Sequence, residues 1–185
     1  MQDTPRHGGL VKTNASNSPY WLLRALCYYL ESEGHKMAIE RTFSMLKPGM
    51  VQRRLAGEII ARIERKGLKI VALKMRMIPK SLAETHYAEH REKSFFAELV
   101  SFIVSGPVVA MVIEGDNAIA QVRKLCGATK VEDALPGTIR GDFAMHTGLN
   151  IIHASDSTTS AEREIGLFFE KSEILAWADG NDAWI

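Results

Sequence analysis

Cysteine is scarce in this 185-residue chain, which carries only Cys27 and Cys126. Two cysteines without motif spacing do not make a disulfide framework, and they favour a reducing compartment. Neither sign of charge predominates, because 23 Lys and Arg balance 22 Asp and Glu for a net charge of +1. This balance excludes Coulombic attraction of the whole molecule to nucleic acid or an anionic membrane, although a local patch can still bind an anion. We therefore expect a cytoplasmic protein that requires neither membrane nor nucleic acid.

Long apolar runs are absent as well. The stretch from Tyr20 to Leu30 is apolar apart from Arg24, and it is shorter than the roughly 20 residues that span a bilayer. A secretory signal is disfavoured because Arg24 interrupts the run and no small-residue cleavage site follows. We interpret residues 1–36 as an N-terminal extension, disordered or forming a short helix, that lies outside the functional fold. Residues 37–185 are then expected to form one domain.

Short strands and helices alternate after Met37. The expected strands cover 41–46, 69–78, 108–114 and 150–153, and the expected helices cover 58–66, a segment from Ser81, 95–103, 117–125 and 160–169. In the second strand Val71, Leu73, Met75 and Met77 alternate with other residues, which predicts one buried side. Gly67 is expected to end the first helix. No repeat of fixed period occurs, so the pattern predicts a single α/β domain with a sheet covered by helices.

Both glycine-rich phosphate motifs are missing. The chain has no Gly-x-x-x-x-Gly-Lys-Ser/Thr, and no Gly-x-Gly-x-x-Gly follows an expected strand. The segment Lys47-Pro48-Gly49 reads as a turn after the first strand. Any nucleotide must therefore be held by side chains.

Two further chemistries are weak in this sequence. His86 and His90 form a His-x-x-Glu-His pattern, which in zinc proteases places two ligands on one helix face. A third ligand is not evident, and short patterns of this kind occur by chance. Ser155 lies outside a nucleophile-elbow motif, and a lone Cys126 is more often a buried small apolar residue than a nucleophile.

His153 is the strongest candidate for chemistry. It ends an apolar strand and precedes Ala154 and Ser155, so its ring is expected to be accessible. A neutral imidazole is nucleophilic near pH 7 and accepts a phosphoryl group, provided that a partner holds its other nitrogen. Glu164 on the following helix is a candidate for that partner. Arginine suits bidentate phosphate contacts, and the nearby candidates are Arg123, Thr129 and Arg140.

Five sequence blocks follow one another between about Met37 and Trp184. They are Arg41–Gly49; His86-Tyr87 with Phe95-Phe96; Ser105–Val112; Pro136–Asp142; and Asn150-x-x-His153-Ala154-Ser155-Asp156-Ser157. In these blocks, their order and their spacing, the chain resembles the nucleoside diphosphate kinase family, and five blocks together make the match highly specific.

The resemblance implies a ferredoxin-like α+β sandwich, with an antiparallel sheet covered by helices. It also implies that the γ-phosphate of a nucleoside triphosphate passes to His153 and then to a nucleoside diphosphate, in a ping-pong cycle assisted by Mg²⁺ that the nucleotide phosphates and water hold. No protein metal ligand is implied. Phosphoryl transfer requires mainly alignment and charge neutralisation, which this residue set provides. The implied roles are His153 as nucleophile with Glu164 orienting it, and nucleotide binding by Lys47, Tyr87, Phe95, Arg123, Thr129, Arg140 and Asn150.

Some residues depart from the family pattern. Lys130 and Val131 replace the usual Asn-Pro after Thr129, in a loop that often helps subunits pack. The expected homo-oligomer is therefore left open between a tetramer and a hexamer. Two rival functions also stay open: a non-catalytic nucleotide-binding protein, and a metalloprotein built on His86 and His90.

Overall fold

The computed structural model describes residues 39–180 of the chain. The expectation for residues 1–36 concerns a segment outside the described residues. Within the described range no helix is both long and apolar enough to cross a membrane.

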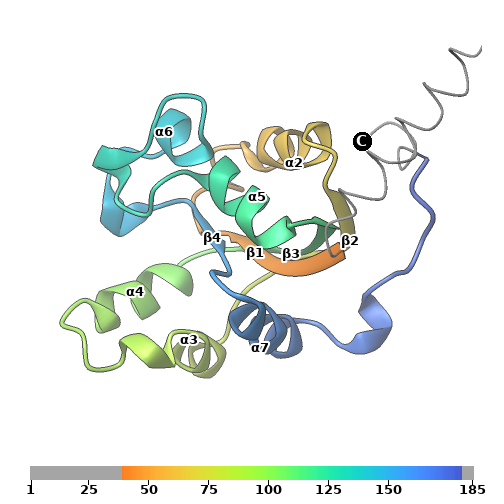
Figure 1. The fold of residues 1–185 in the computed structure, drawn as a ribbon. Coiled ribbons are helices and arrows are strands. Elements are labelled where there is room, and N and C mark those ends of the chain that lie inside the picture. Colours follow the sequence, from red (N-terminus) through yellow and green to blue (C-terminus); the bar gives the residue numbers. More distant parts are fainter. Residues whose placement is uncertain (1–38, 181–185) are drawn as a thin grey trace, which may run out of the picture. The chain divides into compact units, whose positions relative to one another are not determined.

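Four antiparallel strands form the centre of the fold (Figure 1). They are β1 (Ile39–Leu46), β2 (Lys69–Arg76), β3 (Val108–Asp116) and β4 (Ile152–Ala154), in the spatial order β2-β3-β1-β4. β1 pairs along its whole length with β3, and its last residues pair with β4 so that Met45 lies opposite His153. The predicted antiparallel sheet is confirmed, and the short strand β4 places His153 at one edge of the sheet, next to β1.

Helices cover both faces of this sheet, as Figure 1 shows. The helices are α2 (Ala56–Arg65), α3 (Lys80–His86), α4 (Phe96–Ile103), α5 (Ala118–Cys126), α6 (Ile139–Phe143) and α7 (Thr158–Phe168). On one face α2 and α5 bury Ile59, Ile63 and Val122 against Met111. On the other face α3, α4 and α7 pack around Phe43. Because alternate strand residues point to opposite faces, one sheet supports two apolar layers.

Helix α2 ends as its sequence predicts. Gly67 has a positive φ of 85°, a conformation that favours glycine. The Gly67 N–H donates to the Glu64 carbonyl and the Leu68 N–H donates to the Ile63 carbonyl, which is the hydrogen-bond pattern of a Schellman motif. Leu68 and Ile63 are both buried in the same core cluster. The chain is thereby turned directly into β2.

The prediction of one buried side for β2 is wrong. The pairing with β3 shifts between Ile70 and Ala72, so both Val71 and Ala72 are buried. Beyond this bulge, Leu73, Met75 and Met77 are 48%, 62% and 57% exposed. One extra residue in a strand moves all later side chains to the opposite face, which leaves an exposed apolar row on an edge strand.

Candidate active site

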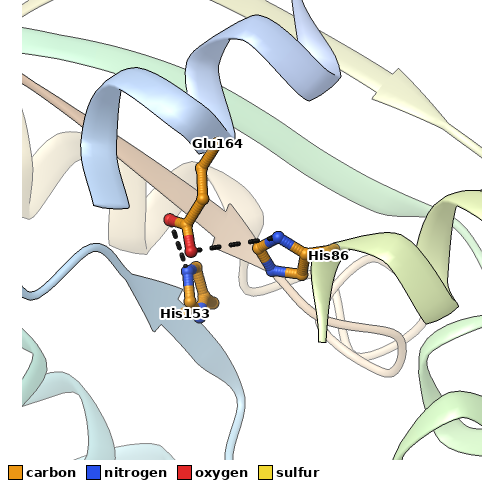
Figure 2. A group of neighbouring side chains, drawn as sticks. All are labelled: His86, His153 and Glu164. Atoms are coloured by element: carbon orange, nitrogen blue, oxygen red, sulfur yellow. Dashed lines mark hydrogen bonds and ion pairs between the residues drawn. The ribbon is translucent and has the colours of Figure 1, made fainter. Parts of the chain in front are cut away.

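The two predicted catalytic residues meet at the end of β4. Nε2 of His153 lies 2.8 Å from Oε2 of Glu164, which projects from α7 (Figure 2). Glu164 is buried, whereas the His153 side chain is 21% exposed. Since a carboxylate only accepts hydrogen bonds, Nε2 of His153 carries the proton and Nδ1 retains its lone pair. This is the tautomer and orientation that a nucleophilic imidazole needs.

Two further side chains donate hydrogen bonds to Glu164. The Ser155 hydroxyl donates to Oε2 over 2.6 Å, and the Arg163 guanidinium donates to Oε1 over 3.4 Å. These partners fix the carboxylate relative to His153. A buried carboxylate requires such donors, because burial without them is costly.

His86, the last residue of α3, lies on the other side of this carboxylate (Figure 2). Its ring centroid is 4.7 Å from that of His153 in an edge-to-face arrangement. Nδ1 of His86 lies 3.9 Å from Oε1 of Glu164, beyond hydrogen-bond range. Burial, together with the nearby positive charges, lowers the pKa of His86 to about 2, so the ring is neutral and the contact is not an ion pair.

Lys47 and Asn150 lie together near the aromatic side chain of Tyr87. Nζ of Lys47 donates to Oδ1 of Asn150 over 2.8 Å and lies 5.8 Å from the centre of the Tyr87 ring. Burial, and secondarily the charge of Arg140, lowers the pKa of Lys47 to about 8. Tyr87 in turn contacts His153, with ring centroids 6.3 Å apart. The structure therefore brings these predicted residues to the His153 centre.

Arg140 is buried and links two parts of the chain. Its Nη1 donates to the Gly127 carbonyl over 2.6 Å and its Nη2 donates to the Ile152 carbonyl over 2.7 Å. Ile152 directly precedes His153, so Arg140 ties the end of α5 to the strand that carries the candidate nucleophile. Each of these guanidinium NH₂ groups has a second N–H that can contact a phosphate.

Phe95 stands further out, at the start of α4, and is 48% exposed. Its ring lies 5.7 Å from that of His90, which stacks against Tyr87 at 6.3 Å. A row of rings thus leads from the exposed Phe95 to His153.

Arg123 and Thr129 line an open pocket of about 930 Å³ between α5 and the start of α7. Asp156 and Ser157, which follow β4, also line it, but His153 does not. The pocket therefore lies beside the centre formed by His153 and Glu164 rather than around it.

Residues 39–180 support neither a zinc site built on His86 and His90 nor a nucleophilic Cys126. α3 ends at His86, and His90 lies in a separate 3-10 turn, so the two histidines do not share one helix face. His90 instead lies 3.6 Å from Glu89. Burial raises the pKa of the Cys126 thiol to about 11, which leaves little thiolate for a nucleophilic role.

Sequence reasoning did not assign His86, Ser155 or Arg163 to the site. Ser155 follows His153 by two residues and Arg163 precedes Glu164, so proximity in the sequence was a usable signal for both. His86 directly precedes Tyr87, which gave the same kind of signal, but its contact with Glu164 could not be predicted because only the packing of α3 against α7 brings the two together.

Comparison with known proteins gives one consistent result. The family model described as nucleoside diphosphate kinase matches residues 40–174. The nucleoside diphosphate kinase of Archaeoglobus fulgidus is 62% identical over 147 residues, which cover 80% of this chain and 97% of the relative. The enzyme of Treponema pallidum is 57% identical over 145 residues, or 78% of this chain and 97% of the relative.

A solved structure agrees with these relatives. The halophilic nucleoside diphosphate kinase from Halobacterium salinarum, in complex with CDP, has a TM-score of 0.78 and 54% identity, and covers 80% of this chain and 98% of that chain. The ferredoxin-like fold is confirmed. The chain therefore belongs to the nucleoside diphosphate kinase family and is a nucleotide-binding phosphotransferase.

Proposed function

We propose that the chain transfers the γ-phosphate of a nucleoside triphosphate to a nucleoside diphosphate through a phosphohistidine on His153. The observation that carries this proposal is the 2.8 Å contact between Nε2 of His153 and Glu164. It holds the proton on Nε2 and leaves the Nδ1 lone pair for phosphorus. The negative charge of Glu164 also favours the imidazole as it becomes cationic on phosphorylation.

The reaction has two matching halves. Nδ1 attacks the γ-phosphorus, the bond from that phosphorus to the β–γ bridging oxygen breaks, and the nucleoside diphosphate leaves with the electron pair. In the second half, a terminal phosphate oxygen of the acceptor diphosphate attacks the same phosphorus and the bond to Nδ1 breaks. One site serves both nucleotides in turn, which accounts for the ping-pong order.

In this proposal the remaining polar residues bind the nucleotide and neutralise the charge of its phosphates. Arg123, Thr129 and Arg140 contact the phosphates, while Lys47 and Asn150 hold the ribose hydroxyls and the surroundings of the transferred group. The support is their placement: Lys47 and Asn150 are bonded to each other, and Arg140 is anchored one residue before His153.

The base stacks on Phe95, and Tyr87 lines the site between Phe95 and His153. The exposure of Phe95 at the outer end of the row of rings supports this role. Because every base has a π-face, stacking accepts different bases.

Magnesium fits this site as an ion carried by the nucleotide. Mg²⁺ prefers oxygen ligands and keeps several waters, and among residues 39–180 the one cluster of three potential ligands contains two imidazoles. Asp156, whose pKa is held below its ordinary value by hydrogen bonds from Ser160 and Ser157, offers an ionised carboxylate to the ion's water. When bound, Mg²⁺ supplies neutralisation of phosphate charge.

The exposed row Leu73, Met75 and Met77 supports assembly into a homo-oligomer, a tetramer or a hexamer, because exposed apolar rows on edge strands favour association.

We also propose a cytoplasmic location and a catalytic domain of residues 37–185. Activity of residues 37–185 produced alone, equal to that of the full chain, tests this boundary.

The mechanism is tested by the mass of the intact protein after brief incubation with ATP and Mg²⁺ and no acceptor. We expect one added phosphoryl group, lost on acid treatment or on addition of a nucleoside diphosphate. The adduct should be absent in His153→Ala and present in His146→Ala, a control that removes an exposed histidine elsewhere. Folded wild-type protein without an adduct would overturn the covalent mechanism and favour a nucleotide-binding protein.

A further inference from the structure

His86 raises a question that phosphoryl transfer does not answer. Its side chain is 1% exposed, yet neither Nδ1 nor Nε2 has a hydrogen-bond partner among residues 39–180. Leaving a buried donor or acceptor unsatisfied destabilises the folded protein. Such an orphaned group in a folded protein calls for an unseen water or ion, or for a role of its own.

The surroundings of His86 contain the other ligands that a metal ion needs. One ligand atom each from His86, His153 and Glu164 lie within 4.8 Å of one another, and Figure 2 shows both rings turned toward the carboxylate. Two imidazoles and one glutamate make a ligand set that zinc enzymes use, with a fourth position open to water. Bond lengths of about 2.0 Å place tetrahedral ligand atoms about 3.3 Å apart, so small side-chain rotations would complete the site.

We propose that His86, His153 and Glu164 form an inhibitory binding site for a zinc-like transition-metal ion, occupied when no nucleotide is bound. The ion would coordinate Nδ1 of His86, Nε2 of His153 and a carboxylate oxygen of Glu164, and the exposed side of His153 provides access. The site does not suit Mg²⁺, since nitrogen ligands select zinc, cobalt and nickel over magnesium.

The consequence for the enzyme follows from the tautomer of His153, and it rests on the proposed function. When Nε2 binds the ion, its proton moves to Nδ1, so the ring remains neutral and no proton is lost. Nδ1 then has an N–H in place of its lone pair and cannot attack phosphorus. The ion also coordinates the Glu164 carboxylate oxygen that otherwise accepts the hydrogen bond from His153 and orients its ring. Metal binding and phosphorylation of His153 therefore exclude each other.

Neighbouring charges set the strength of this site. Arg163 lies 3.4 Å from Oε1 of Glu164, and Lys47 adds positive potential at His86. Both oppose a cation, so we expect binding weaker than in a structural zinc site. Arg163 is 41% exposed and can turn toward solvent when the ion enters.

The experiment uses the full chain without nucleotide, because a triphosphate itself binds zinc. Co²⁺ is the spectroscopic probe: four-coordinate Co²⁺ with nitrogen ligands absorbs in the visible region far more strongly than the hexahydrated ion. We expect an intense visible band in wild-type protein, displaced by added Zn²⁺ and unaffected by Mg²⁺. In His86→Phe, which keeps an aromatic ring among Phe43, Tyr87 and Phe168, Co²⁺ affinity should fall about tenfold or more. His146→Phe is the matched control and should retain wild-type affinity.

A second measurement does not depend on the folding of a variant. In wild-type protein with ¹⁵N-labelled histidine, added Zn²⁺ should shift the ring nitrogens of His86 and His153 and leave those of His90 and His146 unchanged. Pre-incubation with Zn²⁺ should also reduce the phosphoenzyme formed by the wild type. Unshifted His86 resonances, or equal Co²⁺ affinity in His86→Phe and wild type, would overturn the proposal. Failure of the mechanism at His153 is seen separately, as a missing phosphoenzyme in metal-free protein.

Discussion

Several hydrogen bonds of the site meet at one carboxylate, that of Glu164. It accepts hydrogen bonds from His153, Ser155 and Arg163 while buried against α3. In the proposed mechanism both its charge and its position contribute, because His153 has to keep one tautomer and then carry a positive charge on phosphorylation. Residues of this kind act on the rate of the reaction more than on the binding of substrate.

Replacing Glu164 by Gln removes the charge and keeps the shape. We expect the rate of phosphoenzyme formation to fall by about 10²-fold or more, in the range typical of acid–base partners, with nucleotide affinity nearly unchanged. Rapid-quench measurement with ATP gives the rate. Glu162→Gln, on the exposed side of α7, is the control and should behave as wild type. A Glu164→Gln rate close to wild type would show that the hydrogen bonds suffice without the charge.

Lys47 predicts a pH dependence. Its pKa of about 8 means that it is charged below that pH and neutral above it. In the proposed site the Lys47 ammonium donates to the ribose hydroxyls, and its positive charge also attracts the anionic nucleotide, so the dissociation constant of a nucleoside diphosphate should rise as pH increases through about 8, by up to about tenfold per pH unit. Equilibrium titration across this range measures it.

Lys47→Arg identifies the group responsible. A guanidinium stays charged throughout this range, so the variant should lose the rise in dissociation constant. Lys66→Arg, on the exposed end of α2, should keep it. A wild-type profile that is flat above pH 8 would refute the assignment to Lys47.

At the scale of elements, Arg140 joins α5 to β4 through two backbone carbonyls. Arg140→Met would leave both carbonyls without this donor in a buried position. We expect a loss of about 2–4 kcal/mol in the free energy of unfolding, measured by urea denaturation.

Arg123→Met is the contrast, because Arg123 is exposed. It should weaken nucleotide binding and change stability by less than about 0.5 kcal/mol. Equal stability of the two variants would contradict the linking role of Arg140.

The positions of the helices and strands could largely be predicted from the sequence. Which face of each element is buried was harder to predict. The apolar spacing of Ile59 and Ile63 and the glycine at 67 are local signals, and α2 follows them. The bulge at Val71 has no local signal, because it depends on how β2 aligns with β3. That one residue decides whether Met75 is buried or exposed.

At the scale of the whole molecule, the exposed row on β2 predicts where copies of the chain meet. Met75→Lys places a charge in this row and should shift the protein toward smaller species in light scattering after size exclusion. Charges on an edge strand oppose association. Ile39→Lys, at an exposed residue of β1, should leave the mass unchanged. An unchanged mass for Met75→Lys would place the interface elsewhere.

The sequence by itself determined the family of this protein and its phosphotransferase activity, because five motif blocks occur in the family's order and spacing. The same resemblance proposed His153, Glu164 and the nearby arginines as the reacting site, since residue type alone does not distinguish a nucleophilic histidine from an ordinary polar one. Tertiary structure decided which side chains converge. His86 precedes Glu164 by most of the domain, and only the packing of α3 and α7 on one face of the sheet brings them to 3.9 Å. The exposed row on β2 likewise arose from strand alignment, since a contact between distant segments has no signature in either segment alone.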